Sequence, residues 1–297
     1  MSLDTLLTEQ PNAASRDIDA KPTAEILRIM NDEDGKVAGA VSAEIPRIAQ
    51  AVERIVEIMR KGGRLFYIGA GTSGRLGVLD AAECPPTFNV APDLVQGIMA
   101  GGAAALAKST EATEDDPETG KHDLERRGFT ASDALVGIAA SGRTPYVLGA
   151  VAMARELGAL TIGISCTPGS ELSRAVEIAI TPLCGAEVIT GSTRLKAGTA
   201  TKLVLNMIST AVMIRLGYVY GNLMVNVAPR NSKLEDRARR IIAQSASVSH
   251  ERAGELLMQA NGNVKTAIVM ARLALDRAEA EAKLAGADGR IAEALKT

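Results

Sequence analysis

The order of apolar and polar positions along the chain predicts alternating helices and strands over residues 44–232. From residue 44, apolar residues recur at the spacing of an amphipathic helix until Gly62 and Gly63 end it. Short apolar runs follow at residues 65–68, 94–99, 134–139, 160–165 and 176–180, each typical of a buried parallel strand. Helical stretches such as 144–157 separate most of them. The pattern predicts an α/β domain with a doubly wound sheet of about five parallel strands.

Both ends of the chain lack that strand pattern. Residues 1–43 are polar and mixed, which predicts an N-terminal arm followed by a helix. Residues 233–297 are rich in Ala, Glu and Arg, with helical periodicity and a turn at 261–263. We expect a small C-terminal helical domain of two to four helices there, used for packing or dimerisation.

Composition excludes nucleic acid and membranes as expected partners. A net charge of −2 over 297 residues gives no electrostatic attraction to nucleic acid or to an anionic membrane. Only 2% of residues are aromatic and none is Trp, so platforms for base stacking are not expected. The most apolar predicted helix, 195–218, carries Lys196, Lys202, Asn206 and Arg215, which a membrane span does not favour.

The distribution of Cys and His predicts neither a metal site nor a disulfide framework. The three cysteines are scattered without metal-ligand spacing, and the chain has only two histidines. The first residues are polar and lack the apolar core of a signal peptide. We therefore expect a cytoplasmic protein without a bound metal.

Three Gly- and hydroxyl-rich loops lie where phosphate-binding loops occur in such sheets, between a strand and a helix or before the longest helix. Backbone N–H groups at a helix start and nearby hydroxyls bind phosphate, and glycines let the backbone approach it. In a doubly wound sheet the loops converge at the carboxyl ends of the strands. The candidate phosphate and sugar contacts are Thr72, Ser73 and Gly74 in loop 69–75, Ser141, Gly142 and Arg143 in loop 139–144, and Ser192 and Lys196 in loop 191–196.

Each loop taken singly also fits a Gly-rich turn with a hydroxyl helix cap. The first also fits the dinucleotide pattern G-x-G-x-x-G through Gly69, Gly71 and Gly74. That pattern requires an acidic residue about 20 positions on, to hold the ribose, and the next predicted strand ends instead in Ala100-Gly101-Gly102. A nicotinamide cofactor is therefore not expected, and the sequence implies no cofactor.

Five longer strings of the sequence carry a resemblance to a known family: Gly69–Phe88, Ala139–Val147, Gly191–Thr199, Leu205–Thr210 and Gly221–Val225. With them the chain resembles the N-acetylmuramic acid 6-phosphate etherases, a family with a sugar isomerase (SIS) domain. The resemblance runs from about residue 8 to the C-terminus. Pro11-Asn12-Ala13 and Thr201 depart from the family pattern, and neither lies in a phosphate loop.

The resemblance implies a flavodoxin-like SIS fold and a homodimer with active sites near the subunit interface. It also implies hydrolysis of the D-lactyl ether of N-acetylmuramic acid 6-phosphate, giving N-acetylglucosamine 6-phosphate and D-lactate in cell-wall recycling. The related glucokinase regulatory protein carries the SIS unit twice, so a single copy here favours pairing between chains.

The chemistry of such an ether requires an acid and a base. The ether lies β to the carbonyl of the open sugar, so a base removes the C2 proton, lactate leaves from C3 and water adds back. With two histidines in the chain, carboxylates are the natural candidates. The resemblance implies that Glu83 is the proton donor to lactate and that Glu114 is the base at C2.

The residues alone leave other interpretations open. Glu83 in Ala82-Glu83-Cys84-Pro85-Pro86 also fits a solvated charge at a helix end that the two prolines stop. Glu114, in an acidic run, fits a solvated loop, and Lys196 fits an exposed helix lysine. Two alternative functions remain, a sugar-phosphate isomerase and a non-catalytic phosphosugar sensor. An isomerase needs no acid at C3, so the setting of Glu83 discriminates.

Overall fold

The computed structural model describes residues 7–108, 113–227, 229 and 231–296. By its internal contacts the chain divides into two compact units. Unit 1 comprises Met1–Ala82 and Pro92–Ser209, and unit 2 comprises Glu83–Ala91 and Thr210–Thr297. The division falls within two helices, α4 (Gly71–Phe88) and α9 (Lys196–Arg215). The domain limits predicted from the sequence, 43/44 and 232/233, stay a prediction.

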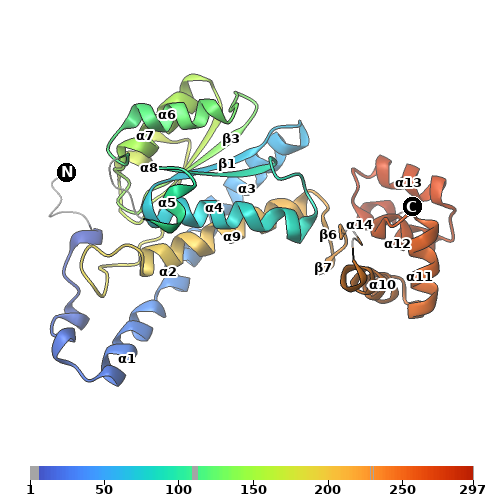
Figure 1. The fold of residues 1–297 in the computed structure, drawn as a ribbon, viewed down its shortest axis with the longest axis horizontal. Helices are drawn as coiled ribbons and strands as arrows, with labels where there is room; N and C mark the ends of the chain where they lie inside the picture. The colour runs from blue at the N-terminus through green and yellow to red at the C-terminus, as the bar shows by residue number, and fades with distance from the viewer. Residues whose placement is uncertain (1–6, 109–112, 228, 230, 297) are drawn as a thin grey trace. The chain divides into compact units, whose positions relative to one another are not determined.

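A parallel five-stranded sheet forms the centre of unit 1 (Figure 1). Its strands are β1 (Leu65–Gly69), β2 (Val95–Met99), β3 (Ala134–Ile138), β4 (Leu160–Ile164) and β5 (Ile178–Ile180). They lie in the order β2-β1-β3-β4-β5, and Leu65 pairs with both Val95 and Ala134. This is the flavodoxin-like order, whose switch point lies between β1 and β3. The predicted fold class and all five predicted strands are confirmed.

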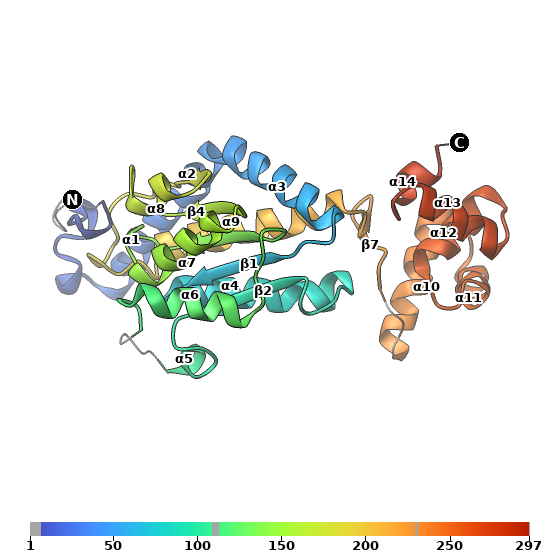
Figure 2. The same cartoon turned by 90° about the horizontal axis from the view of Figure 1, so that it is seen from above.

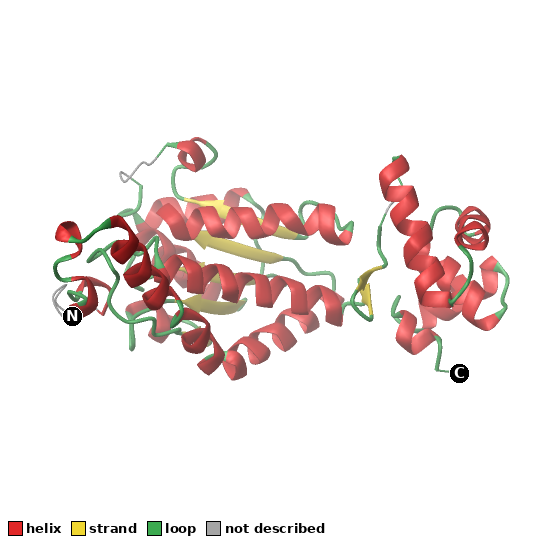
Figure 3. Ribbon diagram, turned by 90° about the horizontal axis from the view of Figure 1, so that it is seen from below, coloured by secondary structure: helices red, strands yellow, loops and turns green. Residues whose placement is uncertain are grey.

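Helices cover both faces of the sheet, as the yellow strands between red helices in Figure 3 show. α3 (Ile45–Arg60) packs on β4 and β5, whereas α7 (Pro145–Glu156) packs on β1, β3 and β4. α6 (Pro117–Arg126) packs against α7, and α8 (Glu171–Ala175) packs against α7, β4 and β5. Apolar side chains from β1, β3 and α7 fill the core on the α7 side: Phe66, Ile68, Leu135, Val147, Ala150 and Val151.

The N-terminal arm of unit 1 is built from short helices. Three 3₁₀ helices, at Leu7–Glu9, Ala13–Ser15 and Ile18–Ala20, precede α1 (Thr23–Asp34) and α2 (Val37–Ala43). Figure 2 shows this blue segment leading into α3. Most of α1 is exposed, and Glu33 is its one buried residue. A charged residue buried on an exposed helix needs a specific partner, which it finds far along the chain.

Unit 2 is mainly helical in the described residues. A short hairpin of β6 (Val219–Tyr220) and β7 (Leu223–Met224) precedes α10 (Ser232–Ala246). Four helices follow: α11 (His250–Gln259), α12 (Val264–Leu273), α13 (Arg277–Gly286) and α14 (Ile291–Ala294). The predicted helix, turn, helix around residue 262 is confirmed. The predicted count of two to four helices is too low: α10 to α14 make five, and the sequence reasoning missed the capping box of Asp276 and Glu279 that begins α13.

The double proline does not end α4, contrary to the sequence-based prediction. The helix continues through Pro85 and Pro86 to Phe88. Two prolines remove only two backbone donors near the helix end, and the next turn still closes, since the N–H of Asn89 donates to the Pro85 carbonyl at 2.8 Å. Asn89 then adopts a left-handed φ of 49°, which ends the helix.

The long helix α9 has the length and the apolar composition of a membrane span, with a mean hydropathy of 1.3 over an 18-residue window. However, 56% of that window is buried inside the protein, which is the behaviour of a core helix.

Polar side chains join α9 to α4. Asp80 of α4 accepts hydrogen bonds from Asn206 (2.6 Å) and Ser209 (3.2 Å) of α9, so the two helices are held side by side.

Candidate functional site

The first predicted phosphate loop is a tight connection between β1 and α4. A Cβ atom on Gly69 would lie 2.7 Å from the Gly74 nitrogen, and one on Gly74 would lie 2.6 Å from the Gly69 carbonyl oxygen. Only glycine fits at either position. α4 begins at Gly71, so the N–H groups of Thr72 and Ser73 belong to its first turn, where helix geometry provides no intrahelical acceptor. The loop is built for a close approach to an anion.

The second loop follows β3 and is equally constrained. Gly142 has a left-handed φ of 67°, and a side chain there would overlap Ser170. The Ser141 hydroxyl accepts a hydrogen bond from the N–H of Arg143 at 3.3 Å. Because Ser141 and Arg143 stay partly exposed, both remain accessible to a ligand.

The arginines of the two Ser-Gly-Arg strings each brace their own loop. Arg75 donates to the carbonyls of Ala105 (2.8 Å) and Leu106 (3.1 Å) in the short helix α5 (Ala104–Ala107). Arg143 forms an ion pair with Glu171 of α8, with Nε 3.5 Å from a carboxylate oxygen. The sequence prediction that Arg143 contacts the sugar phosphate stays a prediction.

Glu114 lies next to the first loop. Its carboxylate oxygen Oε1 is 3.4 Å from the position that a Cβ on Gly71 would occupy. Its carbonyl accepts a hydrogen bond from the N–H of Tyr146 at 3.1 Å, which fixes the backbone to the start of α7. The side chain is half-buried, unlike the solvated loop residue that its acidic neighbours indicate. Glu111 of the same run lies outside the described residues.

The third loop contacts the first one. A Cβ on Gly198, in the first turn of α9, would lie 3.5 Å from the methyl group of Thr72. Ser192 and Thr193 are partly exposed in the loop itself. The structure therefore places the first turns of α4 and α9 against each other, with the first and third loops at that junction.

Two buried carboxylates already occupy the start of α9. Glu187 accepts hydrogen bonds from the N–H groups of Lys196 (3.0 Å) and Ala197 (2.9 Å), so it caps the helix. Lys196 is 1% exposed, and its ammonium donates to Glu33 at 2.5 Å. The interpretation of Lys196 as an exposed helix lysine is wrong. Its predicted phosphate contact stays a prediction, although Glu33 already binds its ammonium.

Glu33 is held as a carboxylate. Burial acts to raise the pKa of Glu33, but hydrogen bonds from Lys196, Lys36 and Asn12 outweigh it and lower that pKa from 4.5 to about 2. Sequence reasoning missed Glu33 and Glu187, because neither belongs to a local motif and Glu33 lies 163 positions from Lys196.

Glu83 lies on the exposed surface of α4. Ten residues of this helix separate it from Ser73, or about 15 Å along the helix axis at 1.5 Å per residue. Within this helix, therefore, Glu83 is remote from the phosphate loop, whereas Glu114 lies beside that loop. The assignment of Glu83 as proton donor stays a prediction.

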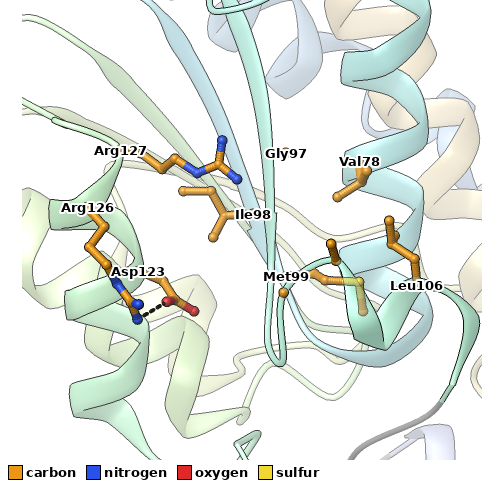
Figure 4. Close-up of a pocket in the computed structure, with 10 residues that line it drawn as sticks. Val78, Gly97, Ile98, Met99, Leu106, Asp123, Arg126 and Arg127 are labelled. Carbon is orange, nitrogen blue, oxygen red and sulfur yellow. Dashed lines mark hydrogen bonds and ion pairs between the residues drawn. The ribbon is translucent and has the colours of Figure 1, made fainter.

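A separate cavity of about 290 Å³ opens at the edge strand β2 (Figure 4). Figure 4 shows Val78 and Leu106 on one side and Arg126 and Arg127 on the other, with Arg126 paired to Asp123 at 2.7 Å. None of the residues predicted to bind phosphate or to act on the sugar lines it. We therefore locate the candidate site at the loops and not in this cavity.

Comparisons with known proteins agree with the fold and extend it. Residues 47–155 match the glucokinase regulatory protein N-terminal SIS domain. The phosphoheptose isomerase from Neisseria gonorrhoeae superposes with a TM-score of 0.50 at 17% identity, over 64% of this chain and 99% of its own. At that identity the likeness concerns the fold alone.

Full-length relatives are far more similar. The N-acetylmuramic acid 6-phosphate etherase of Caldanaerobacter subterraneus is 52% identical over 100% of this chain and 97% of its own length. The enzyme of the same name from Jannaschia sp. is 55% identical over 90% of this chain and 84% of its own. Identity at this level along essentially the whole chain establishes that it belongs to the N-acetylmuramic acid 6-phosphate etherase family.

Proposed function

We propose that this protein cleaves the D-lactyl ether of N-acetylmuramic acid 6-phosphate, giving N-acetylglucosamine 6-phosphate and D-lactate in the cytoplasm during cell-wall recycling. The observation that carries the proposal is the Glu114 carboxylate beside Gly71 of the first phosphate loop. A carboxylate next to an anchored phosphosugar is in position to act on that sugar. The names of the full-length relatives supply the substrate class.

The reaction proceeds by elimination and addition. With the sugar ring open, the Glu114 carboxylate takes the C2 proton, the C2 electron pair forms the C2–C3 double bond, and the C3–O bond breaks. The departing lactate oxygen receives a proton from Glu83. Water then adds its hydroxyl at C3, and a proton returns to C2. Elimination and addition together amount to hydrolysis of the ether.

Hydroxyl and N–H groups anchor the phosphate. Thr72, Ser73 and Gly74 offer the first turn of α4, and Ser141, Gly142 and Arg143 offer the second loop. Ser192 adds the third loop. Lys196 completes the predicted set, but its ammonium would reach a phosphate only by leaving Glu33.

A homodimer supplies Glu83 from the second copy. The phosphate is attached at C6 and the ether at C3, a span much shorter than the approximately 15 Å of helix between Ser73 and Glu83. One α4 helix therefore does not present both groups to one sugar. A symmetric pair of chains, each giving Glu83 to the other's loops, completes both sites.

Mixing two inactive variants tests this arrangement. When Glu83→Gln and Glu114→Gln dimers exchange subunits in equal amounts, about half of the resulting dimers are heterodimers. If Glu83 acts across the interface, one of the two sites in each heterodimer has both glutamates, so about a quarter of wild-type activity should return. If both glutamates act within one chain, every site carries one defect and no activity returns.

Release of D-lactate from N-acetylmuramic acid 6-phosphate by the purified protein tests the function itself. Lactate release together with N-acetylglucosamine 6-phosphate supports the etherase. Interconversion of sugar phosphates without lactate would instead indicate an isomerase. Binding of the phosphosugar without any turnover would indicate a sensor.

A further inference from the structure

We infer that the N-terminal arm, residues 7–44, positions the third phosphate loop, and that Lys196 is a positioning residue locked to Glu33 and not a ligand of the phosphate. The inference rests on the proposed function, because it concerns how the phosphosugar site is held in shape. It assigns a role in the site to Glu33, Asn12 and Glu187.

The arm contacts the segment 181–196 at several points along its length. These contacts join side chains or carbonyls of the arm to backbone groups of the segment: Glu44 Oε2 to Thr181 N–H at 2.9 Å, Asn12 Nδ2 to Ala186 O at 2.9 Å, Ser15 Oγ to Val188 O at 2.7 Å, and Thr8 O to Gly191 N–H at 3.1 Å. Such a row fixes the path of the loop from β5 to α9.

The arm also fits closely over the turn that begins the third loop. Gly191 has a left-handed φ of 78°, and a Cβ there would lie 2.9 Å from the Glu9 carboxylate. The left-handed φ requires glycine here, and the Glu9 carboxylate of the arm packs directly against this turn.

The Glu33–Lys196 pair is the most buried contact between the two segments. The side chains are 5% and 1% exposed, and Asn12 donates to the same Glu33 oxygen at 2.9 Å. Removing Glu33 leaves the buried Lys196 ammonium without its carboxylate, which is costly, whereas removing Lys196 still leaves Glu33 in contact with Lys36 and Asn12. An ammonium held in this way is a poor candidate for a mobile phosphate ligand.

Glu187 points to the same conclusion from the helix side. Its carboxylate occupies the N–H groups of Lys196 and Ala197, so a phosphate arriving at that end of α9 would meet a carboxylate already bound there. The third loop contributes Ser192 to the site. It also positions the first loop, because Gly198 at the start of α9 packs on Thr72.

Direct binding and positioning predict opposite results for Glu33. If Lys196 binds phosphate, Glu33 competes with the phosphate, so Glu33→Gln should keep or strengthen phosphosugar binding while Lys196→Met weakens it. If the pair positions the loop, both variants weaken binding alike. The double variant should then bind the phosphosugar no more weakly than the single variant with the lower affinity, because both substitutions remove the same contact.

The experiment measures Kd for N-acetylglucosamine 6-phosphate, and kcat and KM for N-acetylmuramic acid 6-phosphate, well below the unfolding temperature. We expect Glu33→Gln, Lys196→Met and the double variant to raise Kd and KM by about tenfold or more, with kcat within a few-fold of wild type. Lys21→Met is the matched control, since Lys21 pairs with Asp17 and Glu25 within the arm itself, and its loss should leave KM unchanged.

Two further measurements keep the inference testable. Asn12→Ala removes the hydrogen bonds to Glu33 and Ala186 but keeps the charge pair, so it should raise KM by less than Glu33→Gln does.

Without any ligand, amide hydrogen exchange over residues 186–197 should accelerate in Glu33→Gln, while residues 139–147 exchange as in wild type. This readout holds even if the protein releases no lactate, so failure of the proposed function is distinguishable.

Tighter or unchanged phosphosugar binding in Glu33→Gln, with weaker binding in Lys196→Met, would overturn the inference and make Lys196 a phosphate ligand. Unchanged hydrogen exchange over residues 186–197 in Glu33→Gln would overturn it as well, because the loop would then keep its shape without the arm.

Discussion

The first and third phosphate loops of unit 1 reach their shapes by different routes. The first is set within six residues, by the mutual fit of Gly69 and Gly74 between β1 and α4. The third depends on Glu33 and Asn12 from the arm and on Glu187, a buried cap nine positions before Lys196. A site can therefore contain one loop encoded by a local motif and another that exists only when distant segments pack.

The largest expected effect concerns Glu114, the carboxylate beside the locally built loop. Glu114→Gln should lose both lactate release and exchange of the C2 proton with deuterated solvent, by at least about 10²–10⁴-fold. Glu83→Gln, the matched variant, should lose lactate release while C2 exchange persists. Both rates are followed by NMR, and exchange that survives only in Glu114→Gln would show that the roles are reversed.

Next in size are losses at the anchoring hydroxyls. Ser73→Ala and Ser141→Ala each remove a hydrogen bond to a charged phosphate, which costs roughly 1.5–3 kcal/mol, so KM should rise about ten- to hundredfold. Unphosphorylated N-acetylmuramic acid should be a very poor substrate in steady-state assays. Similar turnover with and without the phosphate would remove the basis for reading these loops as its anchor.

A smaller effect is expected at the cap of α9. Glu187→Ala leaves the N–H groups of Lys196 and Ala197 without their acceptor, and loss of a helix cap typically costs about 0.5–2 kcal/mol. Denaturant unfolding should show that loss, together with a higher KM. Asp276→Ala, which removes the cap of α13 in unit 2, is the matched control and should lower stability without raising KM.

The contact between the arm and the third loop should also depend on pH. The pKa of Glu33 is lowered from 4.5 to about 2, so its contribution to stability is fully present above pH 4.5 and is lost as the pH falls toward 2. The difference in urea midpoint between wild type and Glu33→Gln should be constant from pH 6 to 8 and shrink below about pH 4.5. A constant difference down to pH 3 would contradict the lowered pKa.

The sequence predicted most of the sheet and of the first two loops, because both depend on neighbouring residues. Apolar runs of about five residues set the strands, and Gly-Thr-Ser-Gly between a strand and a helix is a local signal. Pro85 and Pro86 misled because near a helix end the loss of two donors is tolerated.

The environment of Lys196 was beyond sequence reasoning. Its burial and its pairing with Glu33 depend on how the arm folds back over residues 181–196, and one sequence contains no periodicity that reports such a contact. Glu114 shows the same limit, since its acidic neighbours indicate solvent while the fold places its carboxylate against Gly71.

Isotope labelling tests the elimination and addition reaction most directly. Product formed from N-acetylmuramic acid 6-phosphate in heavy-oxygen water should carry the label in the C3 hydroxyl of N-acetylglucosamine 6-phosphate, with unlabelled D-lactate, as mass spectrometry would show. Retention of the original oxygen at C3, with label in lactate, would mean cleavage on the lactyl side and would contradict Glu114 as the base at C2.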